Sequence, residues 1–166
     1  KPDVNKKVEN VRFMGFYTNG AERNLKTSEL TLQNFFAKPE KGIFEGSLRI
    51  RNFEDPYVKV NLHADFDLQF VGDFFGLESL EGLQGEVVLD MDFDELVDLD
   101  ASQASLSKIK ESLQSELTLK NLHFRWADYP HPIEDVNAHM VMREGKITLD
   151  TLHLRVQNSD FGLSGT

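Results

Sequence analysis

Residues 57–70, YVKVNLHADFDLQF, alternate between apolar and polar side chains over an unusual length. The even positions from Val58 to Phe70 are apolar, and the odd positions between them are polar or charged. Because successive side chains of a β-strand point to opposite faces of the sheet, this pattern predicts a strand with one apolar and one polar face. Such a strand would be roughly 46 Å long, more than most strands of globular domains. Its apolar face needs a second sheet, a membrane or lipid to cover it.

The same alternation recurs along the chain, in IFEGSLRI (43–50), GEVVLDMDFD (85–94) and EDVNAHMVM (134–142). Gly145, in MREGKIT, predicts a hairpin turn after the last of these segments. Counted in this way, the sequence predicts about eight strands that each keep one apolar face.

A short motif in which the apolar–polar alternation is interrupted occurs three times, as LTLQNFF (30–36), LTLKNLHF (117–124) and ITLDTLHL (147–154). In each copy two polar residues interrupt the pattern, which then resumes one residue out of phase. Such a slip would turn the following apolar residues to the wrong face unless a β-bulge takes up the extra residue. The motif therefore predicts three bulges and a repeated β unit. The alternative is that the motif recurs by chance in a β-rich chain.

Two stretches lack the strand pattern. Residues 71–84 have apolar side chains near helical spacing and predict a short helix at one end of the sheet, whereas the Ser-rich residues 96–114 predict a flexible connection or a short helix. Residues 1–25 carry a weaker pattern, interpreted as an N-terminal strand. We expect one mainly β domain over residues 1–166: a long, twisted antiparallel sheet curved into an open groove or half-barrel, with one or two short helices.

Composition excludes several functions. The net charge of −10 argues against binding to nucleic acid or to an anionic lipid surface, which both need Lys and Arg. The chain has no Cys, and so neither disulfides nor thiolate chemistry. No apolar run is long enough for a membrane-spanning helix. Because the chain starts with KPDVNKK and ends with LSGT, we interpret it as a piece of a longer protein.

No motif for catalysis or metal binding stands out. Asp90, Asp92 and Asp94 have the spacing of a calcium loop, but its sixth and twelfth positions are Glu95 and Ala101 rather than Gly and Glu. These carboxylates alternate with apolar residues, so a solvated strand face explains them better. The five His form no ligand pair, and no nucleotide or hydrolase motif occurs. The sequence predicts no enzyme, no metal site and no cofactor.

The motifs at the starts and ends of the predicted strands resemble those of the AsmA family. The motifs are the turn FEDP (53–56) before a long alternating strand that ends in DL (67–68), the strand LQGEVVLD (83–90), and the hairpin EGKITL to SDFGLSG (144–165). The resemblance covers about residues 26–166. It implies a Gram-negative envelope protein anchored in the inner membrane, with a long periplasmic β-structure related to bridge-like lipid-transfer proteins. Its partners would be phospholipid acyl chains and flanking β-repeats of the same chain.

On this interpretation the apolar faces of the strands form one wall of an acyl-chain path that carries phospholipid between the two membranes or serves outer-membrane assembly. The candidate groove residues are Val58, Val60, Leu62, Phe66, Leu68, Val87, Leu89, Met91, Phe93, Leu117, Leu119, Leu122, Phe124, Val136, Met140, Met142, Ile147, Leu149, Leu152 and Leu154. The alternatives are a closed β-sandwich that serves as a structural or binding module, an outer-membrane barrel and a surface adhesin. A piece cut from a repeat would also leave unpaired sheet edges, expected near residues 26–36 and 160–166.

Overall fold

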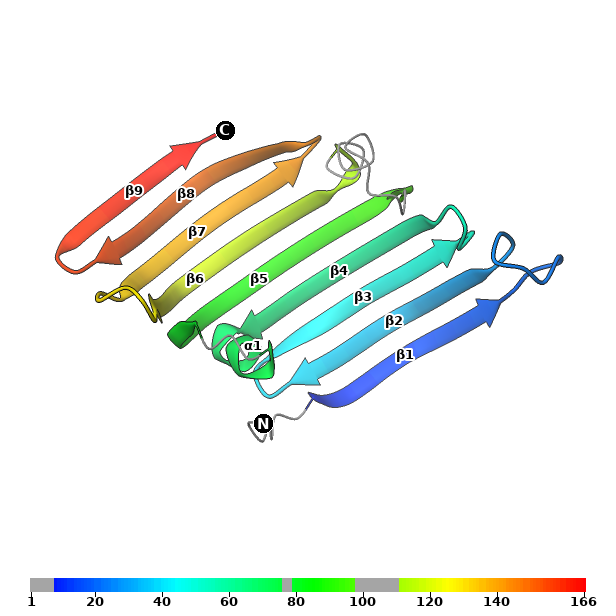
Figure 1. Ribbon diagram of the computed structural model, residues 1–166, viewed down its shortest axis with the longest axis horizontal. Coiled ribbons are helices and arrows are strands. Elements are labelled where there is room, and N and C mark those ends of the chain that lie inside the picture. The colour runs from blue at the N-terminus through cyan, green and yellow to red at the C-terminus, as the bar shows by residue number, and fades with distance from the viewer. Residues whose placement is uncertain (1–7, 76–78, 98–110) are drawn as a thin grey trace.

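A computed structural model describes residues 8–75, 79–97 and 111–166. They form one antiparallel sheet of nine strands in chain order, with one short helix (Figure 1). The strands are β1 (Val8–Thr18), β2 (Glu29–Pro39), β3 (Gly42–Arg51), β4 (Tyr57–Asp67), β5 (Leu80–Leu96), β6 (Gln114–Trp126), β7 (Ile133–Arg143), β8 (Lys146–Val156) and β9 (Ser159–Gly165), and the helix is α1 (Leu68–Phe75).

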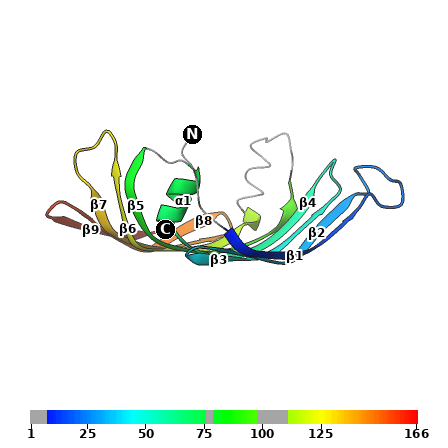
Figure 2. The same cartoon turned by 90° about the horizontal axis from the view of Figure 1, so that it is seen from below.

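The predicted fold class is confirmed. Each strand pairs with its neighbours in the sequence, β1 and β9 form the two outer edges, and the sheet does not close on itself. Seen along its surface, the sheet is curved, and α1 lies on the inner side of the curve (Figure 2). The sheet therefore has a concave face and a convex face.

The register of the strands places the apolar phases on one face. Residues directly opposite each other in neighbouring strands point to the same side of a sheet. Leu89 lies opposite Leu117, which lies opposite Met140, which in turn lies opposite Leu149. Leu62 lies opposite Met91, in the same phase of β5 as Leu89. The predicted common face is confirmed across β4 to β8.

All three predicted bulges are present. The register shifts between Leu32 and Phe35 in β2, between Leu119 and Leu122 in β6, and between Leu149 and Leu152 in β8. In the first two, an Asn inside the bulge has a positive φ of 50°, a conformation that Asn tolerates better than most residues. Each bulge returns the following apolar residues to the apolar face, as the sequence requires.

The predicted boundary between strand and helix was wrong. The strand expected over 57–70 ends at Asp67, whose carboxylate accepts hydrogen bonds from the amides of Gln69 (2.9 Å) and Phe70 (3.3 Å) and so caps α1. Leu68 is therefore in the helix and not on the sheet. The sequence could not separate the two because apolar residues at 68 and 70 also fit the strand period.

Two further boundaries differ from the prediction. The helix expected over 71–84 ends at Phe75, and β5 already begins at Leu80. Gly82 and Gly85, with φ of 64° and 125°, give this end of β5 an irregular pairing with β6 that hides the strand alternation. The edge expected near 26–36 was also wrong, since β2 lies between β1 and β3.

The insertion predicted over 96–114 is bounded by strands. β5 continues to Leu96 and β6 begins at Gln114. Most of the predicted insertion, residues 98–110, lies outside the described residues.

Candidate functional site

The concave face of the sheet is the apolar face. A Cβ placed on Gly72 of α1 would lie 3.1 Å from Cδ2 of Leu83, so the helix packs against that side chain. The next residue, Gln84, lies opposite His123 on the polar face, which puts Leu83 on the apolar face. Phe70 of α1 is buried, 8% exposed. The helix thus covers one end of the apolar face and identifies it with the inner side of the curve in Figure 2.

Most of the predicted groove residues are half-buried. Only Val87, Phe93 and Val136 among them are buried, and Ile147 is exposed. All the others on the sheet fall between these limits. Packed cores usually bury side chains of this size almost completely. The concave face therefore leaves much of its apolar surface only partly covered by the described residues.

The structure brings together every predicted groove residue except Leu68. It also adds residues from the strands on the N-terminal side: Leu30 and Leu32 of β2 lie opposite Ile50 and Leu48 of β3, which continue the same face. Their alternation was visible in the sequence. The apolar face therefore extends over more strands than the predicted residues cover.

Two pairs of aromatic side chains lie on the concave face, one on β3 and β4 and the other on β6. Phe44 and Phe66 stack with ring centroids 5.4 Å apart, and Phe124 meets Trp126 edge to face at 5.0 Å. Trp126, two residues along the strand from Phe124, shares its face and is 50% exposed at the end of β6. Sequence analysis missed Trp126, although the alternation of β6 reaches it.

The convex face carries ion pairs between neighbouring strands. On β4 and β5, Lys59 contacts Asp94 at 2.7 Å and His63 contacts Asp90 at 2.7 Å. Asn61 donates a hydrogen bond to Asp92 at 3.2 Å. The acidic run of β5 is thus a solvated strand face, as predicted, with each carboxylate opposite a polar residue of β4.

These contacts shift the pKa of several groups. The hydrogen bond to Asp90 raises the pKa of His63, and the hydrogen bond to Asp94 raises the pKa of Lys59. The hydrogen bonds from Lys59 and then Tyr57 lower the pKa of Asp94. Each shift favours the charged form of a group that already has a partner. The groups therefore serve as ion pairs and hydrogen-bond partners between neighbouring strands.

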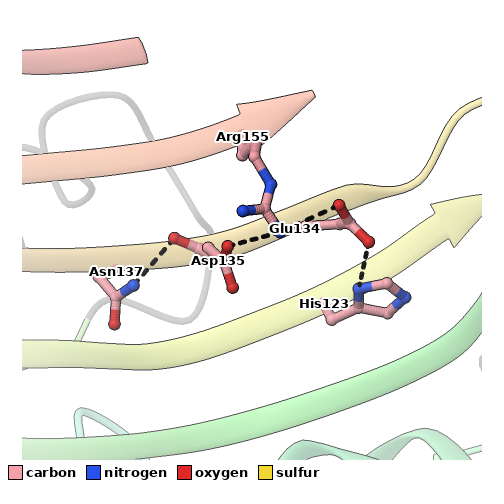
Figure 3. Close-up of polar contacts among 5 residues, drawn as sticks. All are labelled: His123, Glu134, Asp135, Asn137 and Arg155. Carbon is pink, nitrogen blue, oxygen red and sulfur yellow. Dashed lines mark hydrogen bonds and ion pairs between the residues drawn. The ribbon is translucent and has the colours of Figure 1, made fainter. Parts of the chain in front are cut away.

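A second cluster spans β6, β7 and β8 next to a bulge (Figure 3). Arg155 contacts Asp135 at 2.8 Å and Glu134 at 3.3 Å, and His123 lies 3.7 Å from the other oxygen of Glu134. Asn137 donates a hydrogen bond to the carbonyl oxygen of Asp135 (2.9 Å), which holds the positive-φ residue of β7. The cluster ties three strands together on the convex face.

The part of the chain that the structure describes contains no group of three or more His, Asp or Glu side chains that could hold a metal ion. Nor does it contain a helix long and apolar enough to cross a membrane. The feature that stands out is physical rather than chemical: a wide apolar face opposite a face of ion pairs.

Fold and surface together define a class: an open, single-layer antiparallel sheet with an apolar concave face. No family model matches the chain, and comparisons with curated proteins and with solved structures found no significant similarity. Membership of the AsmA family therefore stays a prediction from the sequence motifs.

Proposed function

We propose that this chain is a non-enzymatic, lipid-binding segment of an envelope protein, and that phospholipid acyl chains lie along its concave face. The observation that carries the proposal is the continuous apolar face from β2 to β9, half-buried over most of its area. Burying apolar surface contributes about 25 cal/mol per Å². An acyl chain that binds to this face would be stabilised by this burial, while the phospholipid headgroup would stay in contact with water.

The resemblance to the AsmA family extends the proposal to a place and a role. The full-length protein would be anchored in the inner membrane of a Gram-negative bacterium and reach into the periplasm. Flanking β-repeats of the same chain would continue the face beyond β9, so that phospholipid could pass between the inner and outer membranes or serve outer-membrane assembly.

The alternative, a closed β-sandwich that serves as a structural or binding module, requires a second sheet about 10 Å from the first. The described residues form a single sheet, and α1 packs over one end of its concave face. This arrangement favours a ligand over a packed sandwich partner.

The test compares acidic substitutions on the two faces. Met140 lies half-buried on the concave face, and Thr118, on the adjacent strand, lies half-buried on the convex face opposite His139. Phospholipid should co-purify with the wild-type protein. Met140→Asp places a carboxylate against the acyl chains and should lower the bound phospholipid at least tenfold, the effect of about 1.4 kcal/mol. Thr118→Asp should leave it unchanged.

Both variants should keep the wild-type circular dichroism and melt within a few degrees of it, because neither site is fully buried. Met91→Asp, on the same face of β5, should repeat the result of Met140→Asp. Wild-type protein free of phospholipid would contradict the proposal. Unfolding of both Met variants would indicate a closed core instead.

A further inference from the structure

Strand β1 differs from the inner strands because it exposes large apolar side chains on both faces. Met14 and Phe16 lie opposite Gln33 and Thr31 on the convex side, whereas Tyr17 lies opposite Leu30 on the concave side. In order along the strand, Val11, Phe13, Met14, Phe16 and Tyr17 are 51%, 58%, 59%, 62% and 60% exposed. Strands of an open sheet usually keep a polar side toward water, as β4 and β5 do here.

The outer edge of β1 is also unprotected. The strand is eleven residues long, none of the described strands pairs with its outer side, and the segment from Phe13 to Tyr17 contains no charged residue. Free edges leave backbone N–H and C=O groups unpaired, and proteins ordinarily guard them with charges, prolines or short strands. β1 has none of these guards along this segment.

The other edge strand, β9, is different. It has only seven residues, and its two large apolar side chains, Phe161 and Leu163, lie opposite Leu154 and Leu152 on the concave side alone. Its convex phase carries Asp160 and two small residues. Of the two edge strands, it is therefore β1 that combines a long edge with apolar side chains on both faces.

Strand direction decides which partner fits β1. In an antiparallel sheet of nine strands in chain order, β1 and β9 run the same way, so joining β9 of one copy to β1 of the next would create a parallel pair. Parallel pairing is slightly less stable per residue, and head-to-tail joining forms an open filament unless its rotation closes a ring. Two β1 strands related by a two-fold axis normal to the sheet make an antiparallel pair and a closed dimer.

We propose that β1 pairs with β1 of a second copy of this chain, so that two sheets join edge to edge. Pairing the segment Phe13–Tyr17 with itself places Phe13 opposite Tyr17 of the second copy on the concave side. On the convex side it places Met14 opposite Phe16. Cross-strand pairs of this kind stabilise sheets. Arg12 then faces Thr18, so no like charges meet at the seam although each chain carries a net charge of −10.

Sedimentation equilibrium of the 166-residue chain tests the proposal with two matched variants. Met14→Glu with Phe16→Glu sets carboxylates opposite one another across the seam, at side chains that are exposed in the single chain. Phe161→Glu with Leu163→Glu makes the same change on the opposite edge. The β1 variant should raise the dimer dissociation constant at least tenfold, and the β9 variant should leave it unchanged. Circular dichroism checks that both variants are folded.

The remaining outcomes count against the proposal. A wild-type chain that stays monomeric at high concentration would overturn it, as would a β1 variant that stays as dimeric as wild type. Assemblies larger than dimers that both variants disrupt would show that β9 joins to β1 instead. The proposal does not depend on lipid binding, because the seam can form whether or not the concave face is occupied.

Discussion

His139 is held between two carboxylates at the centre of the convex face. Its Nδ1 lies 2.7 Å from Asp150 of β8 and its Nε2 lies 2.9 Å from Glu116 of β6. Ionised carboxylates only accept hydrogen bonds, so both ring nitrogens must carry a proton for both contacts to form. The hydrogen bond to Glu116, with help from that to Asp150, raises the pKa of His139. A charged imidazole therefore links three strands.

This link makes stability depend on pH in a definite direction. A pKa raised by folding contributes stability that is fully present below the ordinary histidine pKa of about 6.5 and is lost as pH rises through the raised value. His139→Gln should therefore lower the melting temperature at pH 5–6 and have less effect as the pH rises above that window. Glu116→Gln combined with Asp150→Asn should act in the same way. Melting curves across this range check it; a difference independent of pH would contradict it.

At the scale of the single strand, the bulges keep β6 apolar on one side. Asn121 has a φ of 50°, and its backbone N–H donates a hydrogen bond to Oδ1 of Asn137 at 3.0 Å. This conformation lets Leu119 and Leu122 share a face although two residues separate them. The bulge thus converts a slip in the sequence into a continuous apolar face.

Substitutions at Asn121 should separate backbone conformation from side-chain chemistry. Asn121→Val places a β-branched residue at positive φ and should lower the free energy of unfolding by about 1–2 kcal/mol. Asn121→Gly suits that conformation and should stay within about 0.5 kcal/mol of wild type. Urea unfolding measures both. Equal losses in the two variants would mean that the Asn side chain, and not the conformation, stabilises the bulge.

The alternation of apolar and polar residues predicted much of this architecture. It failed where apolar residues fit the period of a strand and that of a helix equally well. It predicted the common face of Leu62 and Leu89 and the three bulges, because a face buried on one side fixes the strand register. It missed the start of α1, since Leu68 and Phe70 fit a strand as well as a helix. The N-terminal strand kept a weak signal because β1 is apolar on both faces and so lacks the two-residue period.

At the scale of the whole molecule, the two faces have opposite character. Domains normally bury the apolar side of a sheet under a second layer. Here α1 covers one end of the concave face, and ion pairs line the convex face. The sequence pattern could not predict what covers the apolar face, because alternation determines only which residues share a face. In the proposed function, acyl chains cover it.

The most direct measurement of this claim uses Trp126, the single Trp of the chain. Its ring packs on Phe124 on the concave face and is half exposed, so bromine atoms on a bound acyl chain would come close enough to quench its fluorescence. Phospholipid brominated in its acyl chains should quench Trp126 in the wild-type protein and in Thr118→Asp, and should quench it far less in Met140→Asp. Fluorescence that stays the same when folded wild-type protein meets the brominated lipid would contradict the proposal that acyl chains lie on the concave face.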